Sequence, residues 1–333
     1  MMNTTTPTIF PLGFPWKTQD PFLFCVYHLD HYPEGNEIMG PAVSLEGRSL
    51  GNDFSEDNPW RMYHGRTVPG FPAHPHRGFE TITIAQKGYC DHTDSLGAAG
   101  RFGQGDVQWM TAGSGVQHAE MFPLLDMEHE NTLELFQIWL NLPKKSKFTP
   151  PHFKMLWQEN IPVIEKETAK IKIITGAYEG HAAPEPTPGS WANDENNEVA
   201  VWMITIRPNG SIVLPKVSAG TTRNLYFYEG ESLTIGETEL RSGFGAALNG
   251  PEDTLIEAGT KTVRLLLLQG KPIAEPVAQY GPFVMNNETE IQEAMDDYRM
   301  TAFGGWPWKK HDVVHPKEKG RFALYPDGRL EEK

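Results

Sequence analysis

The stretch GFPAHPHRGFETITI at residues 70–84 decides the fold class, because it combines strand-forming residues with two closely spaced histidines. Side chains two residues apart in a β-strand point to the same side. The face that carries the histidines is therefore predicted to hold His74, His76, Gly78, Glu80, Ile82 and Ile84. Candidate ligands at one end and apolar residues at the other are typical of the inside of a small barrel. Pro75 cannot donate a ladder hydrogen bond, so the His-Pro-His segment is expected at a strand start or an edge.

A second stretch, GDVQWMTAGSGVQHAEM at residues 105–121, supplies two more candidate ligands. His118 and Glu120 are two residues apart and share a face, and the glycines before them allow a tight turn that delivers this strand beside the first. Three imidazoles and one carboxylate form a borderline donor set that suits iron, copper, zinc, nickel or manganese. Such a set leaves coordination positions open, unlike a closed structural zinc site.

The spacing of these residues is more specific than either pair alone. A lone His-x-His pair is weak evidence, since a single buried histidine is more often a satisfied core residue than a ligand. A His-x-His-x3-Glu pattern followed by a glycine-rich turn and a second histidine motif is the two-part signature of the cupin barrel. We therefore predict one metal at His74, His76, His118 and Glu120.

The composition of the 333-residue chain favours an all-β fold of short strands with a few short helices. The cupin signature, in a chain long enough for two domains, predicts two tandem cupin (jelly-roll) β-barrels. The 32 glycines and 27 prolines suit many short strands joined by turns. The proline-rich segment PKKSKFTPPHF at residues 143–153 is typical of a linker. We predict an N-terminal metal-binding barrel over residues 1–150 and a C-terminal barrel over residues 151–333. A helix is expected after Asn287, with Glu290 completing a capping box.

The second half of the chain lacks the residues of the proposed metal site. No histidine occurs between His181 and His311 in the sequence. When the two halves are aligned on Gly88 and Gly230, the positions of His74, His76 and Glu80 are occupied by Lys216, Ser218 and Thr222. The second barrel is therefore predicted to bind no metal and to serve in packing or as a partner surface.

The charge and the cysteines limit the partners. A formal net charge of −14 and the lack of a basic stripe disfavour direct nucleic-acid binding. The two cysteines, Cys25 and Cys90, are too few for a disulfide framework and are expected to be reduced. We find neither a secretory signal nor an apolar run of the ~20 residues that a membrane helix needs. We expect a cytoplasmic protein that does not bind membranes, with a nuclear location as the alternative in a eukaryote.

Three other features receive structural interpretations. His92, in the segment DHTDS at residues 91–95, is predicted to be a solvated turn residue. Arg77 is expected to face away from the metal and to form an ion pair. Trp306 and Trp308 are expected to pack on a barrel, because large aromatic side chains mostly supply buried area.

The motifs together resemble one family. HPHRGFET (74–81), GDVQWMTAGSG (105–115), HAEM (118–121) and FQIWLNLP (136–143) occur in the order found in pirins, the iron-binding cupins with two barrels. The resemblance is dense over residues 58–143 and thinner elsewhere. It implies a single metal, iron, held by His74, His76, His118 and Glu120. Many other cupins place a carboxylate ligand at the position of Glu80. The resemblance to pirins ranks Glu120 above Glu80 as the metal ligand. Glu80 is then expected to be a partner of a ligand histidine.

The same resemblance implies a function. Some pirins cleave flavonols such as quercetin with dioxygen and release carbon monoxide, a quercetin 2,3-dioxygenase reaction. The substrate here would be a small planar phenol together with O2, and Glu120 would act as the general base that takes the phenolic proton. The alternative is a non-catalytic, iron-dependent redox-sensing regulator that binds a transcription factor or a metabolic enzyme. A third hypothesis is a different small-molecule reaction, such as an isomerisation, at the same metal.

Overall fold

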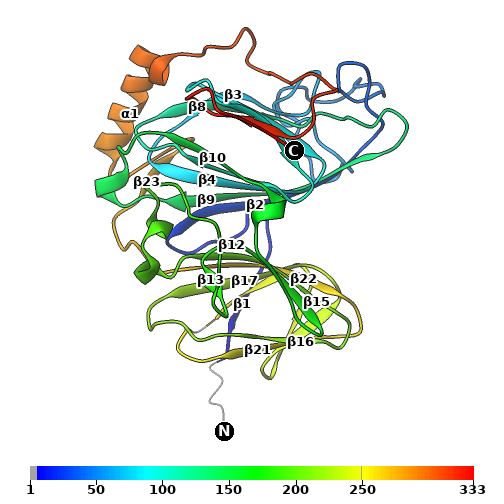
Figure 1. Cartoon of the computed structure of the whole chain (residues 1–333), viewed down its shortest axis with the longest axis vertical. Helices are drawn as coiled ribbons and strands as arrows, with labels where there is room; N and C mark the ends of the chain where they lie inside the picture. The colour runs from blue at the N-terminus through cyan, green and yellow to red at the C-terminus, as the bar shows by residue number, and fades with distance from the viewer. Residues whose placement is uncertain (1–5, 249) are drawn as a thin grey trace. The chain divides into compact units, whose positions relative to one another are not determined.

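The computed structural model describes residues 6–248 and 250–333, and its chain divides into two compact units. The histidine unit comprises Tyr27–Ile138, Leu142–Gln158 and Glu275–Lys333. The second unit comprises Trp139–Asn141, Glu159–Ala274 and the described residues before Tyr27. Both are built mainly from β-strands (Figure 1).

Two sheets form the histidine unit. The order of the five-stranded sheet is β10 (His152–Leu156), β7 (Val107–Thr111), β4 (Phe79–Lys87), β9 (Asn131–Asn141) and β2 (Phe22–Tyr32). One end of β9 and one end of β2 belong to the second unit. The order of the six-stranded sheet is β26 (Leu330–Glu332), β25 (Phe322–Leu324), β6 (Ala99–Gly103), β5 (Tyr89–Asp94), β8 (Val116–Met121) and β3 (Gly70–His76). A core cluster draws on both sheets, with Ala85 and Leu133 from the first and Cys90 and Phe102 from the second. Burial of these apolar side chains stabilises the two-layer arrangement.

The first histidine motif does not continue as one strand. β3 ends at His76 and β4 begins at Phe79, and the two strands belong to different sheets. Gly78 lies at the bend with φ of 88°, a conformation that residues with a Cβ rarely adopt. The predicted common face is therefore wrong beyond His76, and Glu80 lies on a strand of the other sheet.

Gly78 offers a test of this bend. A Cβ built at Gly78 would lie 2.0 Å from the carbonyl oxygen of Val284, whereas one at Gly97, with a similar φ of 87°, would meet nothing within 4 Å. Gly78→Ala should therefore lower the free energy of unfolding by at least about 2 kcal/mol more than Gly97→Ala, which carries only the backbone cost. Urea unfolding of both variants measures the difference. Equal losses would contradict the close packing at this bend.

The second unit also contains two main sheets. The seven-stranded sheet runs β1 (Thr8–Pro11), β20 (Phe244–Ala247), β17 (Thr222–Glu229), β22 (Val263–Gly270), β15 (Ala200–Ile206), β12 (Ala169–Thr175) and β11 (Val163–Glu165). The four-stranded sheet runs β16 (Ser211–Leu214), β21 (Thr254–Ala258), β18 (Ser232–Ile235) and β19 (Thr238–Arg241). Its core includes Trp202, Leu225, Phe227, Leu265 and Leu267. A small hairpin adds β13 (Ala177–Tyr178) and β14 (His181–Ala182).

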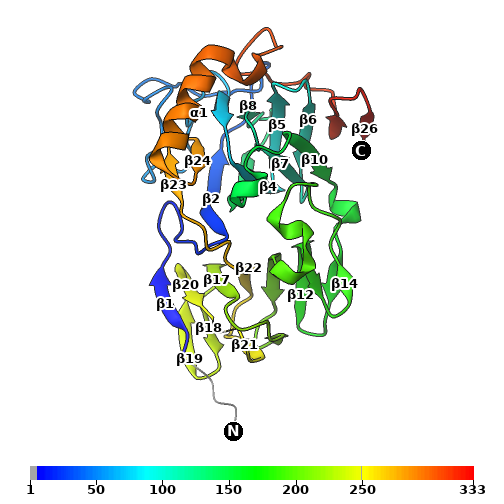
Figure 2. The ribbon, with the colours of Figure 1, turned by 90° about the vertical axis from the view of Figure 1, so that its left-hand side faces the viewer.

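Strands near the two ends of the described chain pair with strands that are far from them in the sequence. β1 pairs with β20, as Figure 2 shows, and so belongs to the unit of Glu159–Ala274. β25 pairs with β6 and so belongs to the histidine unit. The compact units change between Gln158 and Glu159, and each also includes segments from the other half of the sequence. The division into barrels over residues 1–150 and 151–333 stays a prediction.

One α-helix, α1 (Glu288–Thr301), lies where the sequence predicts it. The Asn287 side chain accepts a hydrogen bond from the backbone N–H of Glu290 at 2.9 Å, which caps the helix. Ile291 and Ala294 are buried against β23 (Ala278–Tyr280) and β24 (Phe283–Met285). Among the described residues, no helix combines the length and the apolar character that crossing a membrane requires.

Candidate metal centre

Three histidines from two paired strands converge in the histidine unit. In the antiparallel ladder of β3 and β8, His74 lies directly opposite His118, and His76 follows two residues later on β3. One ring nitrogen from each of the three lies within 4.8 Å of the others. The centroid of the His118 ring is 4.5 Å from that of His74 and 4.9 Å from that of His76. The structure thus brings these three predicted residues together, and their role as metal ligands stays a prediction.

His76 and His118 are buried, His74 is half-buried, and all three imidazoles are neutral at neutral pH. Burial lowers the pKa of His74 to about 4 and holds the pKa values of His76 and His118 well below the ordinary value of a histidine. Each ring therefore keeps a lone pair at neutral pH, as a metal ligand must. Nδ1 of His74 lies 2.9 Å from the carbonyl oxygen of Pro72. A proton on Nδ1 would be donated to that oxygen, which leaves Nε2 as the ligand atom.

His118 shows most clearly that the cluster fits a metal. Its side chain is completely buried, and neither ring nitrogen has a hydrogen-bond partner among the described residues. Leaving a buried polar group unsatisfied costs about 1–3 kcal/mol, so such atoms usually have a partner of some kind. A metal ion at the meeting point of the three rings would supply it.

Glu120 lies beside the histidines on β8. Its Oε2 is 3.7 Å from Nε2 of His118, and its Oε1 is 3.0 Å from Oγ1 of Thr83. Nε2 of Gln137 donates to Oε2 at 3.4 Å. Burial raises the pKa of the Glu120 carboxyl above its ordinary value. The three-histidine group does not include Glu120, so its role as the fourth ligand stays a prediction.

Glu80 occupies a different environment. Its Oε1 accepts hydrogen bonds from Oγ1 of Thr111 at 2.7 Å and from Nε1 of Trp109 at 3.3 Å, and both donors belong to β7 of the five-stranded sheet. The group of three candidate ligands does not include it. The ranking of Glu120 above Glu80 stays a prediction.

His92 is a residue that the sequence interpretation misplaced. It is fully buried on β5, opposite Glu120, and not in a solvated turn. Its ring stacks on Phe153 at 5.0 Å between centroids and lies 5.6 Å from the His118 ring, while its Nε2 is 3.2 Å from the Asp94 carboxylate. The prediction was wrong because the DHTDS segment contains turn-forming residues, although His92 also alternates with Cys90 and Asp94 along a strand.

Arg77 and the C-terminal tryptophans occupy structural positions. Nη1 of Arg77 forms an ion pair with Asp297 at 2.9 Å, and its Nε donates to the carbonyl oxygen of Ser114 at 2.7 Å. Trp308 donates from Nε1 to the carbonyl oxygen of Asp94 at 2.8 Å. Trp306 is half-buried and stacks on His311. These contacts agree with the structural interpretations of Arg77 and Trp308. The contacts of Trp306 lie within its own segment, so its packing on a barrel stays a prediction.

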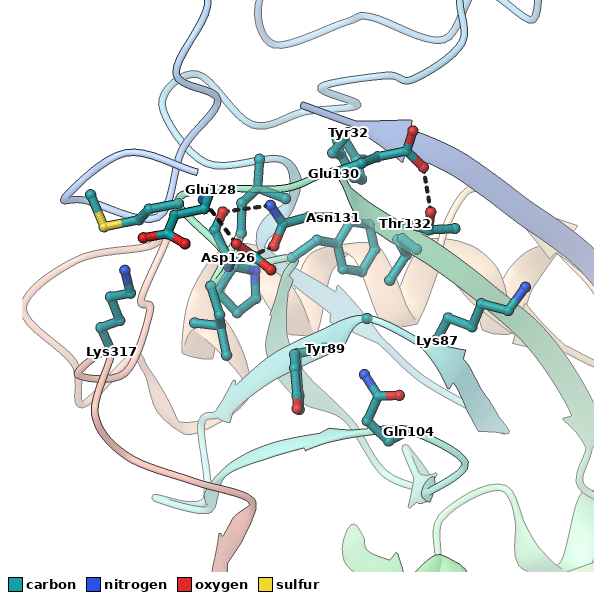
Figure 3. A pocket seen from close by; sticks show the side chains of 17 residues that line it. Tyr32, Lys87, Tyr89, Gln104, Asp126, Glu128, Glu130, Asn131, Thr132 and Lys317 are labelled. Carbon is teal, nitrogen blue, oxygen red and sulfur yellow. Dashed lines mark hydrogen bonds between the residues drawn. The ribbon is translucent and has the colours of Figure 1, made fainter. Parts of the chain in front are cut away.

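A cavity of about 830 Å³ in the same unit lies apart from the candidate ligands. It is lined by the 122–133 segment, by the turn at Lys87–Tyr89 and by Lys317, and none of the three clustered histidines nor Glu120 is among its lining residues. Figure 3 shows side chains of both charges around it, including Lys87, Lys317, Asp126 and Glu130. The chemistry of the histidine cluster therefore does not extend to this cavity.

Comparison with known proteins decides the family. The family model named Pirin matches residues 45–140, and the model of the pirin C-terminal cupin domain matches residues 201–304. The chain belongs to the pirin family. The prediction of an all-β fold with two tandem cupin barrels is confirmed, because this pirin carries both cupin domains of the family.

Relatives and solved structures agree with this assignment. The chain is 38% identical to Pirin-1 of Arabidopsis thaliana, over 71% of this chain and 78% of that protein. It is 34% identical to a pirin-like protein of Solanum lycopersicum, over 81% of this chain and 89% of that one. Among solved structures, a quercetin 2,3-dioxygenase from Acinetobacter baumannii superimposes with a TM-score of 0.70 at 28% identity, covering 91% of this chain and 96% of the other.

Proposed function

We propose that this pirin is a metal-dependent dioxygenase that cleaves flavonols such as quercetin with O2. The observation that carries the proposal is the cluster of three neutral imidazoles, two buried and one half-buried, with the buried carboxylate of Glu120 beside it. The structural similarity of the chain to the quercetin 2,3-dioxygenase of A. baumannii supports the choice of substrate. The reaction would consume one O2 and release one carbon monoxide for each flavonol cleaved.

The proposed metal is iron, held by His74, His76, His118 and Glu120. Imidazole and carboxylate ligands also suit copper, zinc, nickel and manganese. When bound, the metal would supply a Lewis-acidic centre that lowers the pKa of the flavonol hydroxyl and engages dioxygen. The protein contributes a buried setting in which all three rings are already neutral and need lose no proton before binding.

Glu120 is the proposed general base. Its raised pKa makes the carboxylate a better proton acceptor than an ordinary glutamate, and it would take the hydroxyl proton of the flavonol at a carboxylate oxygen. Thr83 and Gln137 hold this carboxylate from the opposite sheet. The Thr83 hydroxyl also lies 2.6 Å from Oε1 of Gln137, and its single proton can serve only one of the two acceptors at a time.

Glu120→Gln tests the assignment of the base. The amide keeps the shape of the side chain and loses the basic oxygen, so kcat/KM per bound iron should fall by about 100- to 10,000-fold. Flavonol consumption, divided by the iron content of each preparation, measures this effect. The exposed Glu130→Gln is the matched control and should keep wild-type activity. Unchanged activity per iron in Glu120→Gln would remove Glu120 as the base.

Carbon monoxide release tests the function itself. Protein reconstituted with Fe(II) and supplied with quercetin in air should release carbon monoxide in proportion to the flavonol consumed. His118→Ala should release none, while His181→Ala, at an exposed position of the second unit, should behave as wild type. Wild-type protein that holds one iron per chain and releases no carbon monoxide would overturn the dioxygenase proposal and favour a non-catalytic role.

A further inference from the structure

The second unit contains a cavity of its own, of about 560 Å³. It lies where β15, β17 and β22 contribute Trp202, Arg223 and Gln269 to its lining. On β17, Arg223 points to the same side as Leu225 and Phe227. On β22, Gln269 points to the same side as Leu265 and Leu267. These four apolar residues belong to the core cluster of this unit. Arg223 and Gln269 therefore face inward at the end of the barrel. A volume of this size is ordinary for a small-molecule site.

The Arg223 guanidinium donates hydrogen bonds from Nε and Nη2, while Nη1 has no hydrogen-bond partner among the described residues. Its side chain is completely buried, its Nε donates to Oε1 of Gln269 at 2.8 Å, and its Nη2 donates to the carbonyl oxygen of Pro215 at 2.8 Å. Nε2 of Gln269 donates in turn to the carbonyl oxygen of Glu198 at 3.0 Å, which fixes the amide with its oxygen toward Arg223.

A second buried donor lines the same cavity. The Trp202 side chain is 2% exposed, and its Nε1–H has no acceptor in the described part of the chain. Two buried donors without acceptors are costly, about 1–3 kcal/mol each and more for a charged group. A ligand that brings acceptor oxygens to both would remove that cost.

No carboxylate of the described residues forms an ion pair with Arg223. Glu198 and Asp253 stabilise its charge electrostatically without such a contact. The carboxylate of Glu198, which also lines the cavity, is already occupied by the backbone N–H and hydroxyl of Ser218 and by the hydroxyl of Thr221. Burial lowers the pKa of Arg223 to about 10, so the guanidinium remains charged at neutral pH.

We propose that this cavity binds a small organic monocarboxylate, whose carboxylate accepts hydrogen bonds from Nη1 of Arg223 and Nε1 of Trp202. Arginine is suited to carboxylates because its planar group offers parallel donors. The apolar body of the ligand would lie against the lining residues Val199, Ala200 and Val217. Three further lining residues, Glu185, Asp194 and Glu195, are exposed acids. They favour a singly charged ligand over a phosphate, which carries more negative charge.

This site is independent of the metal and of the proposed dioxygenase activity. Every lining residue belongs to the second unit, and none is a candidate metal ligand. The role of the second barrel would then include recognition of a ligand, beyond the packing or partner surface expected from its lack of histidines.

Calorimetric titration with sodium benzoate tests the proposal. The titration uses the full chain carrying His118→Ala and freed of metal, so that the carboxylate has no metal to bind. We expect one saturable site per chain, and no binding of benzamide, which is the neutral analogue. Arg223→Met should weaken benzoate binding by at least about tenfold, the loss expected for a charge-assisted hydrogen bond. Arg207→Met, an exposed arginine of the same unit that does not line the cavity, should bind as the parent does.

If Arg223→Met does not fold, Trp202→Phe provides a second variant for the benzoate titration. It retains an aromatic ring and removes the N–H donor, so benzoate should bind several-fold more weakly. The proposal is overturned if the folded parent shows no saturable benzoate binding, if benzamide binds equally well, or if Arg223→Met and Trp202→Phe bind like the parent. Saturable binding of inorganic phosphate without binding of benzoate would also overturn the assignment to carboxylates.

Discussion

Replacing His118 with alanine is expected to lower the affinity of the protein for Fe(II) by more than about 100-fold, because even residues that only support a ligand are worth 10- to 100-fold. His118 lies opposite His74 in the β3–β8 ladder and contributes ring nitrogens that no described protein group engages by a hydrogen bond. Competition with a chromophoric chelator measures the affinity. Circular dichroism of the metal-free proteins checks that both have the same fold.

His181→Ala is the matched control for this prediction. His181 is exposed on β14 in the second unit and should leave the iron affinity unchanged. If His118→Ala bound one iron per chain as tightly as the wild-type protein, the metal would have to lie elsewhere, and the site built from β3 and β8 would be rejected.

Arg101→Met is expected to lower the free energy of unfolding by about 3–5 kcal/mol, the cost of leaving a buried charge without its partner. Arg101 and Asp91 are both fully buried and form two hydrogen bonds, of 2.7 Å from Nε and 2.8 Å from Nη2. Arg101 also donates to the carbonyl oxygens of His315 at 3.0 Å and Lys319 at 2.7 Å. The arginine thus ties the C-terminal segment to β5 and β6. The midpoint of urea unfolding, followed by tryptophan fluorescence, measures the loss.

Two further variants show whether the unpaired charge is the cause. Arg329→Met removes an exposed arginine that pairs with Glu331, and it should change the stability by no more than about 0.5 kcal/mol. The double variant Asp91→Leu/Arg101→Met removes both charges and should recover part of the loss. A loss in Arg101→Met no larger than that in Arg329→Met would contradict the importance of this buried pair.

The sequence was sufficient to predict the part of the site that depends on local periodicity. His74 with His76, and His118 with Glu120, share faces because strand side chains alternate, and this holds whatever the rest of the chain does. The glycine-rich turn before Val116 then brings β8 beside β3. The predicted common face failed at Gly78, because a single residue with positive φ sends the chain into another sheet.

The remaining features depend on pairings that are distant along the chain. Thr83 and Gln137 contact Glu120 from the opposite sheet, so no sequence spacing relates them to it. The pairing of β1 with β20 and of β25 with β6 assigns each terminus to the unit that is distant in sequence. Arg223 illustrates the same limit. The sequence shows that no histidine lies between His181 and His311, but it cannot show that Nη1 of a buried arginine lacks a hydrogen-bond partner among the described residues.

The position of bound iron tests the central claim most directly. Crystals of protein reconstituted with Fe(II) should show one peak per chain in an anomalous difference map recorded at the iron absorption edge. The account predicts that this peak lies among His74, His76 and His118, about 2.0–2.2 Å from one nitrogen of each ring. Iron present in the crystals but bound away from these three rings would contradict the metal centre, and with it the proposed dioxygenase.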